Sequence, residues 1–314
     1  MEKLNIRRAV VTGCTGAVGT ALVRELTKRG AEVLALCRKS SERTARLAGL
    51  ENVKIEDCPL ERLKELKNGK GESFDAFFHL AWSGTTGEAR DDVRLQSDNI
   101  RYSLDAADAA ERFGCKVFVG AGSQAEYGPS GVPLRPDTPT FPKSGYGTAK
   151  LCAGQLTRLA CRKRGIRHIW ARILSVYGPC DGKGSMVMSA IQKFLSGETP
   201  KFTAGEQMWD YLYSEDAARA LVSLAESGKD GGVYPLGSGK SRPLKEFILA
   251  IRDATDKTAE ADFGALPYSS EQVMFLSADT TSLEEDIGWK PQISFEEGIQ
   301  KTVEWFKKEN FFSA

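Results

Sequence analysis

The chain has 314 residues, of which 41% are hydrophobic, enough to bury the core of one large domain or of two interlocked domains. Its 43 Lys and Arg residues nearly balance its 42 Asp and Glu residues. This balance excludes the strongly basic surface typical of proteins that bind nucleic acid or anionic membranes. We therefore expect a small-molecule partner, with no nucleic-acid partner and no membrane partner.

The seven cysteines are scattered and contain no Cys-x-x-Cys pair, and only His79 and His168 accompany them. This pattern predicts reduced, mostly buried thiols and no metal site. His79 ends an apolar run, which predicts a buried residue at the end of a strand. The first eight residues are charged and no apolar run is long enough to span a membrane, so we expect a cytoplasmic protein.

Short apolar runs alternate with amphipathic stretches along the first half of the chain. Runs of this kind are typical of parallel strands that are buried on both faces. The alternation predicts an α/β fold, a Rossmann-type doubly wound parallel sheet with its ligand at the carboxyl ends of the strands. The predicted strands are 8–12, 32–37, 52–56, 74–81, 116–120 and 167–172. Helices are expected after Gly19 through Arg29, from about 146, at about 184–195 and from 295.

A glycine-rich turn joins the first predicted strand to the first helix. Gly13, Gly16 and Gly19 allow a tight turn and a close approach of the backbone to a ligand. The N–H groups at the start of the helix then point at an anion such as a pyrophosphate. The turn therefore predicts a dinucleotide site.

The second predicted strand ends where an NAD site usually carries a carboxylate for the ribose hydroxyls. Here Arg38 follows the strand, with Lys39 and Arg43 close behind. A guanidinium there suits a 2′-phosphate, so the sequence favours NADP(H), with NAD(H) possible; a basic surface turn is the alternative. Asp57, after the third strand, either accepts a hydrogen bond from an adenine amino group or caps the stretch from Pro59, and both interpretations stay open.

Ser123, Tyr146 and Lys150 form a spaced Ser…Tyr-x-x-x-Lys set. On a helix that begins near Tyr146, positions 146 and 150 share one face, so the ammonium can lie beneath the phenol. A phenol that acts as a base at neutral pH needs its pKa lowered by about 3 units, or about 4 kcal/mol, which a nearby positive charge can supply. Because Ser123 follows a strand end, its hydroxyl can donate to the oxygen that Tyr146 protonates. The set predicts the proton-transfer site of a hydride-transfer enzyme.

Together these features resemble the extended short-chain dehydrogenase/reductase family, the NAD(P)-dependent sugar epimerases and dehydratases. The resemblance runs from about residue 7 to the carboxyl terminus. Its motifs are Thr12-Gly13-x-x-Gly16-x-x-Gly19, His79-Leu-Ala81, Asn99-Ile100, Ser123, Tyr146-x-x-x-Lys150, Tyr177-Gly-Pro179, Ile287-Gly-Trp289-x-Pro291 and Phe295-Glu-Glu-Gly298.

The resemblance implies a role for each matching residue. Ser123 would orient the substrate oxygen, Tyr146 would be the acid/base, and Lys150 would lower the pKa of Tyr146 and hold the nicotinamide ribose. The implied cofactor-binding residues are Gly13, Thr15, Gly16, Ala17, Val18, Gly19, Arg38, Asp57, Leu80, Ala81, Asn99, Tyr146 and Lys150, with Asn99 in a structural role. The implied substrate-binding residues are Ser123, Gln124, Ser175 and Trp209.

The resemblance also implies a domain organisation. Residues 1–174, with 210–236 returning, would form the NAD(P)-binding domain, and residues 175–209 and 237–314 would mainly form a smaller substrate-binding domain. Helices at about 90–112 and 146–164 would pair with a second copy as a homodimer.

The family's dehydratases usually carry an Asp-Glu pair after the catalytic Ser or Thr, but here Gln124 and Ala125 follow Ser123. Glu126 comes one position late, which redirects its side chain, so elimination of water is disfavoured. Arg38 favours an NADP(H)-dependent reductase that acts on a keto group of a sugar or nucleotide-activated sugar. The alternatives are an NAD-dependent nucleotide-sugar 4-epimerase and a non-catalytic NADP-binding regulator.

The second half departs from the family in three places, one of which is near Pro267-Tyr-Ser-Ser270, where the family often has an Arg. Ser175 stands where the family often has Asn, and Trp209 stands where it often has an Arg that clamps the pyrophosphate of a sugar nucleotide. Loss of a bidentate contact removes about 1.5–3 kcal/mol. Trp209 either stacks on a base or sugar or packs between the domains, and Lys183, Lys193 or Arg242 is a possible substitute cation.

Overall fold

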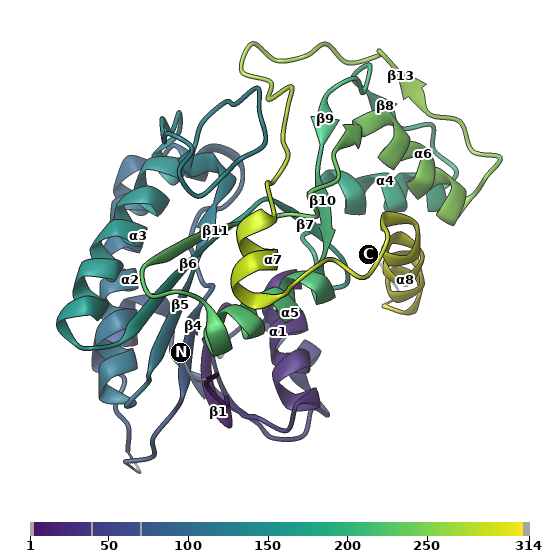
Figure 1. Cartoon of the computed structure of the whole chain (residues 1–314). Helices are drawn as coiled ribbons and strands as arrows, with labels where there is room; N and C mark the ends of the chain where they lie inside the picture. Colours follow the sequence, from purple (N-terminus) through teal and green to yellow (C-terminus); the bar gives the residue numbers. More distant parts are fainter. Residues whose placement is uncertain (1–2, 39, 70, 310–314) are drawn as a thin grey trace.

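The computed structural model describes residues 3–38, 40–69 and 71–309, so Lys39 of the predicted basic turn lies outside the described residues. Its centre is an all-parallel sheet with the strand order β11-β6-β5-β4-β1-β2-β3 (Figure 1). The strands are β1 (Arg8–Thr12), β2 (Glu32–Cys37), β3 (Val53–Asp57), β4 (Ala76–His79), β5 (Val117–Ser123), β6 (Arg167–Ile173) and β11 (Gly232–Leu236). The predicted α/β fold class with a doubly wound parallel sheet is confirmed.

Alternate residues of each inner strand enter opposite layers of the core, because successive side chains of a strand point to opposite faces. Phe77 faces one layer and Phe78 the other, and Phe118 and Val119 of the next strand divide in the same way. All four side chains are fully buried. This burial on both faces explains why the strands are continuous apolar runs.

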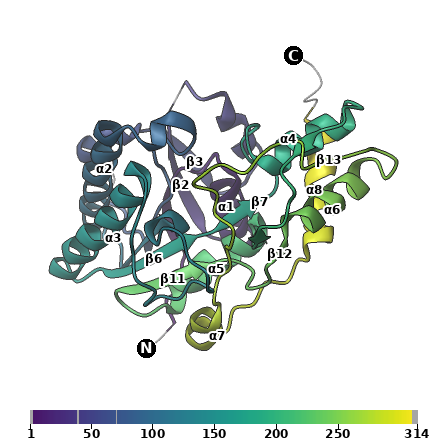
Figure 2. The same ribbon diagram turned by 90° about the horizontal axis from the view of Figure 1, so that it is seen from above.

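Helices cover both faces of the sheet (Figures 1 and 2). The helices α2 (Val93–Arg112) and α3 (Gly145–Lys163) lie together on one face, while α1 (Ala17–Lys28) and α5 (Ser214–Ser227) lie on the other, with α7 (Thr281–Ile287) against α5. Four short 3₁₀ turns lie between these elements. Three of them follow β2, β3 and β5, and one precedes α2: η1 (Glu42–Leu47), η2 (Leu60–Glu65), η4 (Gln124–Glu126) and η3 (Gly87–Arg90).

A second hydrophobic cluster lies beyond the sheet, at the upper right of Figure 1. It is built by α4 (Met186–Leu195), α6 (Leu244–Thr255) and α8 (Phe295–Lys308). The short strands of this half of the chain are β7 (Ser175–Tyr177), β8 (Lys201–Phe202), β9 (Met208–Trp209), β10 (Tyr211–Tyr213), β12 (Arg242–Pro243) and β13 (Asp262–Phe263). Leu283 and Trp289 pack in the cluster of the large sheet, although the sequence-based division placed them with the smaller domain.

Two predicted strands end two or three residues away from their predicted ends, and both of these ends lie at the site. β4 stops at His79, two residues before the predicted end, because Thr12 Oγ1 accepts the backbone N–H groups of Leu80 and Ala81, each at 3.2 Å. β5 continues beyond the predicted Gly120 to Ser123. The small strands, β11, α5, α6 and α7 were not predicted.

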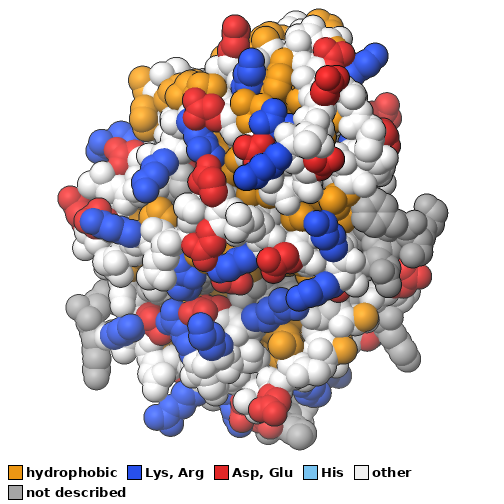
Figure 3. Space-filling view, turned by 90° about the vertical axis from the view of Figure 1, so that its right-hand side faces the viewer, with side chains coloured by type: hydrophobic (Ala, Val, Ile, Leu, Met, Phe, Trp, Pro, Cys, Tyr) orange, Lys and Arg blue, Asp and Glu red, His pale blue; other side chains and the backbone are white. Residues whose placement is uncertain are grey.

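The side of the molecule that carries α6 and α8 shows acidic and basic side chains interspersed over most of its surface (Figure 3). That mixture agrees with the formal net charge of +1. Among the described residues, no helix is long and apolar enough to cross a membrane.

Asp210 joins three separate segments at the junction between the sheet and the second cluster. Its carboxylate is fully buried and accepts the N–H groups of Ser238 at 2.7 Å, of Gly239 at 3.0 Å and of Ala278 at 3.0 Å. The Ser238 hydroxyl donates to it as well, at 2.6 Å. A charged acceptor with this many donors holds the loops around it in one arrangement.

We expect Asp210→Asn to lower the free energy of unfolding by about 2–4 kcal/mol, because the new amide N–H₂ would face buried N–H donors. Urea denaturation of the full chain measures the change. Asp256→Asn is the control, since this exposed carboxylate only accepts local hydrogen bonds from Thr258. Equal, small losses in both variants would contradict the role given to Asp210.

Candidate active site

A cavity of about 830 Å³ lies at the carboxyl ends of β1, β2 and β4. This is the edge at which an open parallel sheet binds its ligand. Of the predicted cofactor residues, Gly13, Thr15, Gly16, Arg38, Leu80 and Ala81 line it. Ala17, Val18 and Gly19 form the first turn of α1 beside it.

The glycine-rich turn has the backbone shape that the prediction required. Gly13 has φ +70°, and a β-carbon there would lie 2.6 Å from the backbone nitrogen of Ala81, so only glycine fits. At Gly16 a β-carbon would meet nothing closer than 3.9 Å, so this side of the turn is open. No side chain caps α1 and its first turn has no acidic residue. The uncapped N–H groups and the open cradle fit the pyrophosphate of a dinucleotide.

The basic residues that follow β2 also reach the cavity. Arg38 and Arg43 both line it, together with the acidic Glu61. Asp57 is the last residue of β3 and is not among the lining residues, and η2 takes Pro59 as its N-cap residue. The adenine contact of Asp57 therefore stays a prediction.

The structure brings Ser123, Tyr146 and Lys150 together at the end of β5. α3 begins at Gly145, where the Ser144 side chain accepts the N–H of Gly147 at 3.1 Å and so fixes the start of the helix. Lys150 lies one turn after Tyr146, and its Nζ is 5.8 Å from the centre of the Tyr146 ring. The Lys150 side chain is buried, and its ammonium donates to the carbonyl of Ala121 at 2.6 Å.

The predicted lowering of the Tyr146 pKa by Lys150 is not found in the protein by itself. Burial raises the pKa of Tyr146 above its ordinary value, while a hydrogen bond with Ser123 and the charge of Arg90 oppose that rise. The same burial lowers the pKa of Lys150 to about 7, and the negative charge of Glu126 opposes this change. The sequence argument omitted the cost of removing both groups from water.

Two residues that the sequence analysis missed contact the Tyr–Lys pair. The indole ring of Trp82 lies 3.8 Å from Lys150 Nζ, and its Nε1 donates to Gln96 at 2.8 Å. The guanidinium carbon of Arg90 lies 4.4 Å from the centre of the Tyr146 ring, which makes it the closer of the two cations. Trp82 directly follows the predicted strand 74–81, so its position was available from the sequence, whereas no pattern placed Arg90.

Asn99 supports the wall that carries Trp82. Its amide accepts the N–H of Ser83 at 2.9 Å and donates to the carbonyl of Ser83 at 2.9 Å and to that of Leu95 at 3.1 Å. His79, buried as predicted, contacts Thr12 at 3.0 Å, and burial lowers its pKa to about 3, so it is neutral. These contacts hold the segment after β4 against the cavity.

The predicted substrate residues are divided between two places. Gln124 lies in η4, beside Ser123, whereas Ser175 lies in β7 and Trp209 in β9. Trp209 Nε1 donates to Ser175 Oγ at 2.9 Å, and its ring packs against the second cluster. Arg242, one candidate for a substitute cation, is paired with Glu296 at 2.6 Å.

The cysteines are all unpaired, as predicted, and most are buried. Within the described part of the chain, no group of three or more His, Cys, Asp and Glu side chains is arranged to hold a metal ion.

The parallel sheet, the open glycine-rich cradle and the Tyr146–Lys150 pair are the features of a dinucleotide-binding α/β enzyme. Residues 9–237 match the model of the NAD dependent epimerase/dehydratase family, and the chain belongs to this family. The predicted resemblance is therefore confirmed.

Individual relatives are similar over most of the chain. The UDP-glucose 4-epimerase of Mycolicibacterium smegmatis is 28% identical over 313 residues, which cover 96% of this chain and 99% of the relative. The dTDP-glucose 4,6-dehydratase of Shigella flexneri is 30% identical over 187 residues, 56% of this chain and 51% of the relative. A structure of UDP-N-acetylglucosamine 4-epimerase from Methanobrevibacter ruminantium, in complex with UDP-N-acetylmuramic acid, aligns with a TM-score of 0.87 at 26% identity, covering 98% of this chain and 100% of that one.

We expect Lys150→Met to raise the free energy of unfolding by about 2 kcal/mol near neutral pH, because it removes a buried charge. The Lys150 pKa is about 7 in the folded state against 10.5 ordinarily, so the unfolded chain binds the extra proton between these values. The stability of the unchanged protein then rises with pH across this window. The difference in free energy of unfolding between Lys150→Met and the unchanged protein should therefore shrink as the pH rises from about 7 to 10.5. Urea unfolding at a series of pH values measures it. The exposed Lys143, changed to Met, is the control; a gap that does not vary with pH would contradict the burial argument.

We expect Arg90→Gln to raise the Tyr146 pKa, because it removes a charge that lowers it. The acid limb of the pH profile of kcat should move up by about 0.5–1 unit, with a loss of about 3–10-fold at pH 7. Arg94→Gln, an exposed change on α2, serves as the control. An acid limb that stays where it is in the unchanged protein would remove Arg90 from the catalytic site.

Proposed function

We propose that the protein is an NAD-dependent nucleotide-sugar 4-epimerase. The observation that carries this proposal is a single proton-transfer group, Tyr146, beside an open dinucleotide cradle, with no carboxylate in the positions that elimination would use. The full-length similarity to a UDP-glucose 4-epimerase supports it. The alternative reaction of the sequence analysis thus becomes the leading one, ahead of the NADP(H)-dependent reductase.

In this proposal each residue of the Ser123–Tyr146–Lys150 set has its own role in the reaction. Bound NAD supplies the chemistry of accepting a hydride from C4 of the sugar and giving it back. Tyr146 takes the proton of the 4-hydroxyl as C4 is oxidised. It returns the proton to the oxygen once the 4-keto sugar has rotated so that its opposite face lies toward the nicotinamide. Ser123 donates a hydrogen bond to the same oxygen, and Lys150 holds the nicotinamide ribose and adds positive charge near the phenol.

Dehydration is disfavoured because this chain has no free acid next to Ser123. Gln124 and Ala125 follow it, and Glu126 is fully buried in an ion pair with Arg172 at 2.6 Å. A carboxylate held this way cannot take a proton from a sugar carbon. The similarity to a dTDP-glucose 4,6-dehydratase, which covers 56% of the chain, fits a shared fold and cofactor site.

A second candidate, an NADP(H)-dependent keto-sugar reductase, rests on Arg38 and Arg43. Both line the cofactor cavity at the end of β2. A 2′-phosphate would meet two guanidinium groups there, although Glu61 on the same wall opposes it. This contact is the one observation that favours NADP(H) over NAD.

The proposal also covers the substrate contacts, the oligomeric state and the domain organisation. We take Ser123 and Gln124 as contacts of the sugar, and Ser175 and Trp209 as a closed pair at the nucleotide side, where the indole offers a ring face rather than a cation. We take the protein as a homodimer through α2 and α3, where Leu156 and Leu159 expose apolar side chains. The clusters support a Rossmann domain and a smaller substrate domain that share Asp210 at their junction.

The purified protein should interconvert a nucleotide-linked sugar and its 4-epimer, with UDP-glucose and UDP-N-acetylglucosamine as first probes, without net loss of reduced cofactor. Tyr146→Phe should lower the rate by about 10²–10⁴-fold and leave NAD binding intact. Product sugars are separated by chromatography, and the cofactor is followed by its absorbance. Net consumption of NADPH with a keto sugar would instead establish the reductase, and a rate that survives Tyr146→Phe would refute both.

A further inference from the structure

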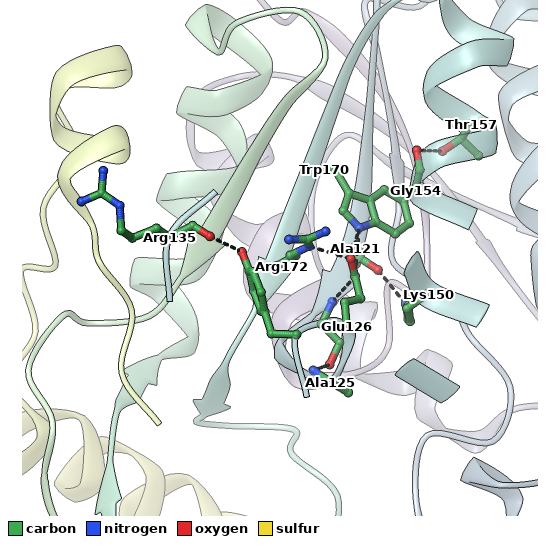
Figure 4. A network of polar contacts seen from close by, with 11 residues as sticks. Ala121, Ala125, Glu126, Arg135, Lys150, Gly154, Thr157, Trp170 and Arg172 are labelled. Carbon is green, nitrogen blue, oxygen red and sulfur yellow. Dashed lines mark hydrogen bonds and ion pairs between the residues drawn. The ribbon is translucent and has the colours of Figure 1, made fainter. Parts of the chain in front are cut away.

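Glu126 is fully buried directly beneath the catalytic serine. Oε1 accepts the backbone N–H of Ser123 at 2.8 Å and the indole N–H of Trp170 at 2.9 Å, and Oε2 accepts the guanidinium of Arg172 at 2.6 Å. Figure 4 shows Trp170 and Arg172 converging on the Glu126 carboxylate from β6. Each donor to the carboxylate comes from a different residue, so its orientation is fixed.

The surrounding sequence makes room for this arrangement. A β-carbon at Gly154 of α3 would lie 2.7 Å from the Trp170 ring, and one at Gly122 of β5 would lie 2.5 Å from Glu126 Oε1. A β-carbon at Gly120 would also overlap the indole ring. Three glycines thus leave the space through which Trp170 reaches the carboxylate, although glycine weakens strands and helices.

The first link from Glu126 to the catalytic site runs through the backbone of Ser123. Ser123 ends β5 and caps η4, and its Oγ accepts the N–H of Ala125 at 3.2 Å. Glu126 completes this capping box by accepting the N–H of Ser123. Because the Ser123 oxygen accepts the N–H of Ala125, its hydroxyl proton points into the site: it bonds to Tyr146 in the protein by itself, and it would turn to the substrate oxygen once a sugar is bound.

The second link runs through charge. The buried ammonium of Lys150 bonds to the carbonyl of Ala121, on the strand that ends at Ser123, and Glu126 is the negative group that acts on it. The other groups that face Lys150 are His79 from β4, which is neutral, and Tyr146 and Trp82. Arg90 faces Tyr146 from η3, and Arg172 faces Glu126 from β6.

We propose that Glu126, oriented by Trp170 and Arg172, is a positioning residue of the catalytic site: it fixes the turn that presents the Ser123 hydroxyl, and it places a negative charge at the end of the strand whose Ala121 carbonyl binds the Lys150 ammonium. Arg172 in turn lies over the ring of Tyr127, with its guanidinium carbon 4.3 Å from the ring centre, so the pair is held on both sides. The proposal rests on the proposed function in one respect, the roles of Ser123 and Lys150 in proton transfer.

Two variants separate the two roles. Glu126→Gln keeps the length of the side chain and an oxygen for Ser123, but removes the charge. Glu126→Asp keeps the charge, but its carboxylate is one methylene too short to reach the N–H of Ser123. The exposed Glu198, changed to Gln, is the matched control.

Removal of the charge should lower the Lys150 pKa, so the ammonium loses its proton at a lower pH than in the unchanged protein. For Glu126→Gln we expect the pH above which NAD binding weakens, measured by calorimetry, to fall by about 1 pH unit. The alkaline limb of the pH profile of kcat should move down by the same amount. For Glu126→Asp we expect both limbs to stay and the plateau of kcat to fall about 10-fold, with KM nearly unchanged. Folded Gln and Asp variants with the limbs and plateau of the unchanged protein would overturn the proposal.

Glu126→Gln leaves Arg172 buried without its partner, which can prevent folding. The double change Glu126→Gln with Arg172→Met removes both charges and keeps the volume of the pair. It should shift the alkaline limb in the same direction but by less, since loss of the Arg172 charge partly offsets loss of the Glu126 charge; an unmoved limb in this folded protein also overturns the proposal. NAD binding needs no sugar. If the unchanged protein epimerises no nucleotide sugar but the binding limb moves as stated, the proposed function fails while the role of Glu126 stands.

Discussion

A positive charge buried at the end of a strand is the constraint on which the rest of this site depends. The ammonium of Lys150 is removed from water and donates to Ala121 on β5. Removal of a charge from water is costly unless other groups replace the solvent. The Trp82 ring lies over the ammonium on one side and the Glu126 charge acts on it, so the elements that carry these two residues must dock where they do.

This constraint links the two layers of the molecule. α3 brings Tyr146 and Lys150 to β5, while β6 brings Trp170 and Arg172 to the carboxylate that follows β5. Trp82, on the wall after β4 that Thr12 and Asn99 hold, contacts the same ammonium and also lines the cofactor cavity. The polar groups that would destabilise an apolar core are therefore gathered at one edge of the sheet, next to the cradle for a dinucleotide.

Function and stability oppose each other at this edge. Burial lowers the Lys150 pKa and raises the Tyr146 pKa, so each group is moved towards its neutral form. Arg90 and the Ser123 hydroxyl oppose that trend for the phenol, and Glu126 opposes it for the ammonium. Asp210 also carries a buried charge, and N–H groups of two distant loops replace its water. Its role is to hold those loops together rather than to transfer a proton.

The sequence by itself determined the parallel sheet, the glycine turn and the Ser123–Tyr146–Lys150 set, because strand periodicity, glycine spacing and an i, i+4 pair are local patterns. It also predicted that the one-residue offset of Glu126 redirects its side chain and so disfavours elimination of water. Only the tertiary structure decided that Trp82 covers Lys150, that Arg90 lies closer to the phenol than Lys150 does, and that Trp209 bonds to Ser175. These contacts join residues far apart in the chain, and the pKa directions depend on how deeply the groups are buried, which no local pattern contains.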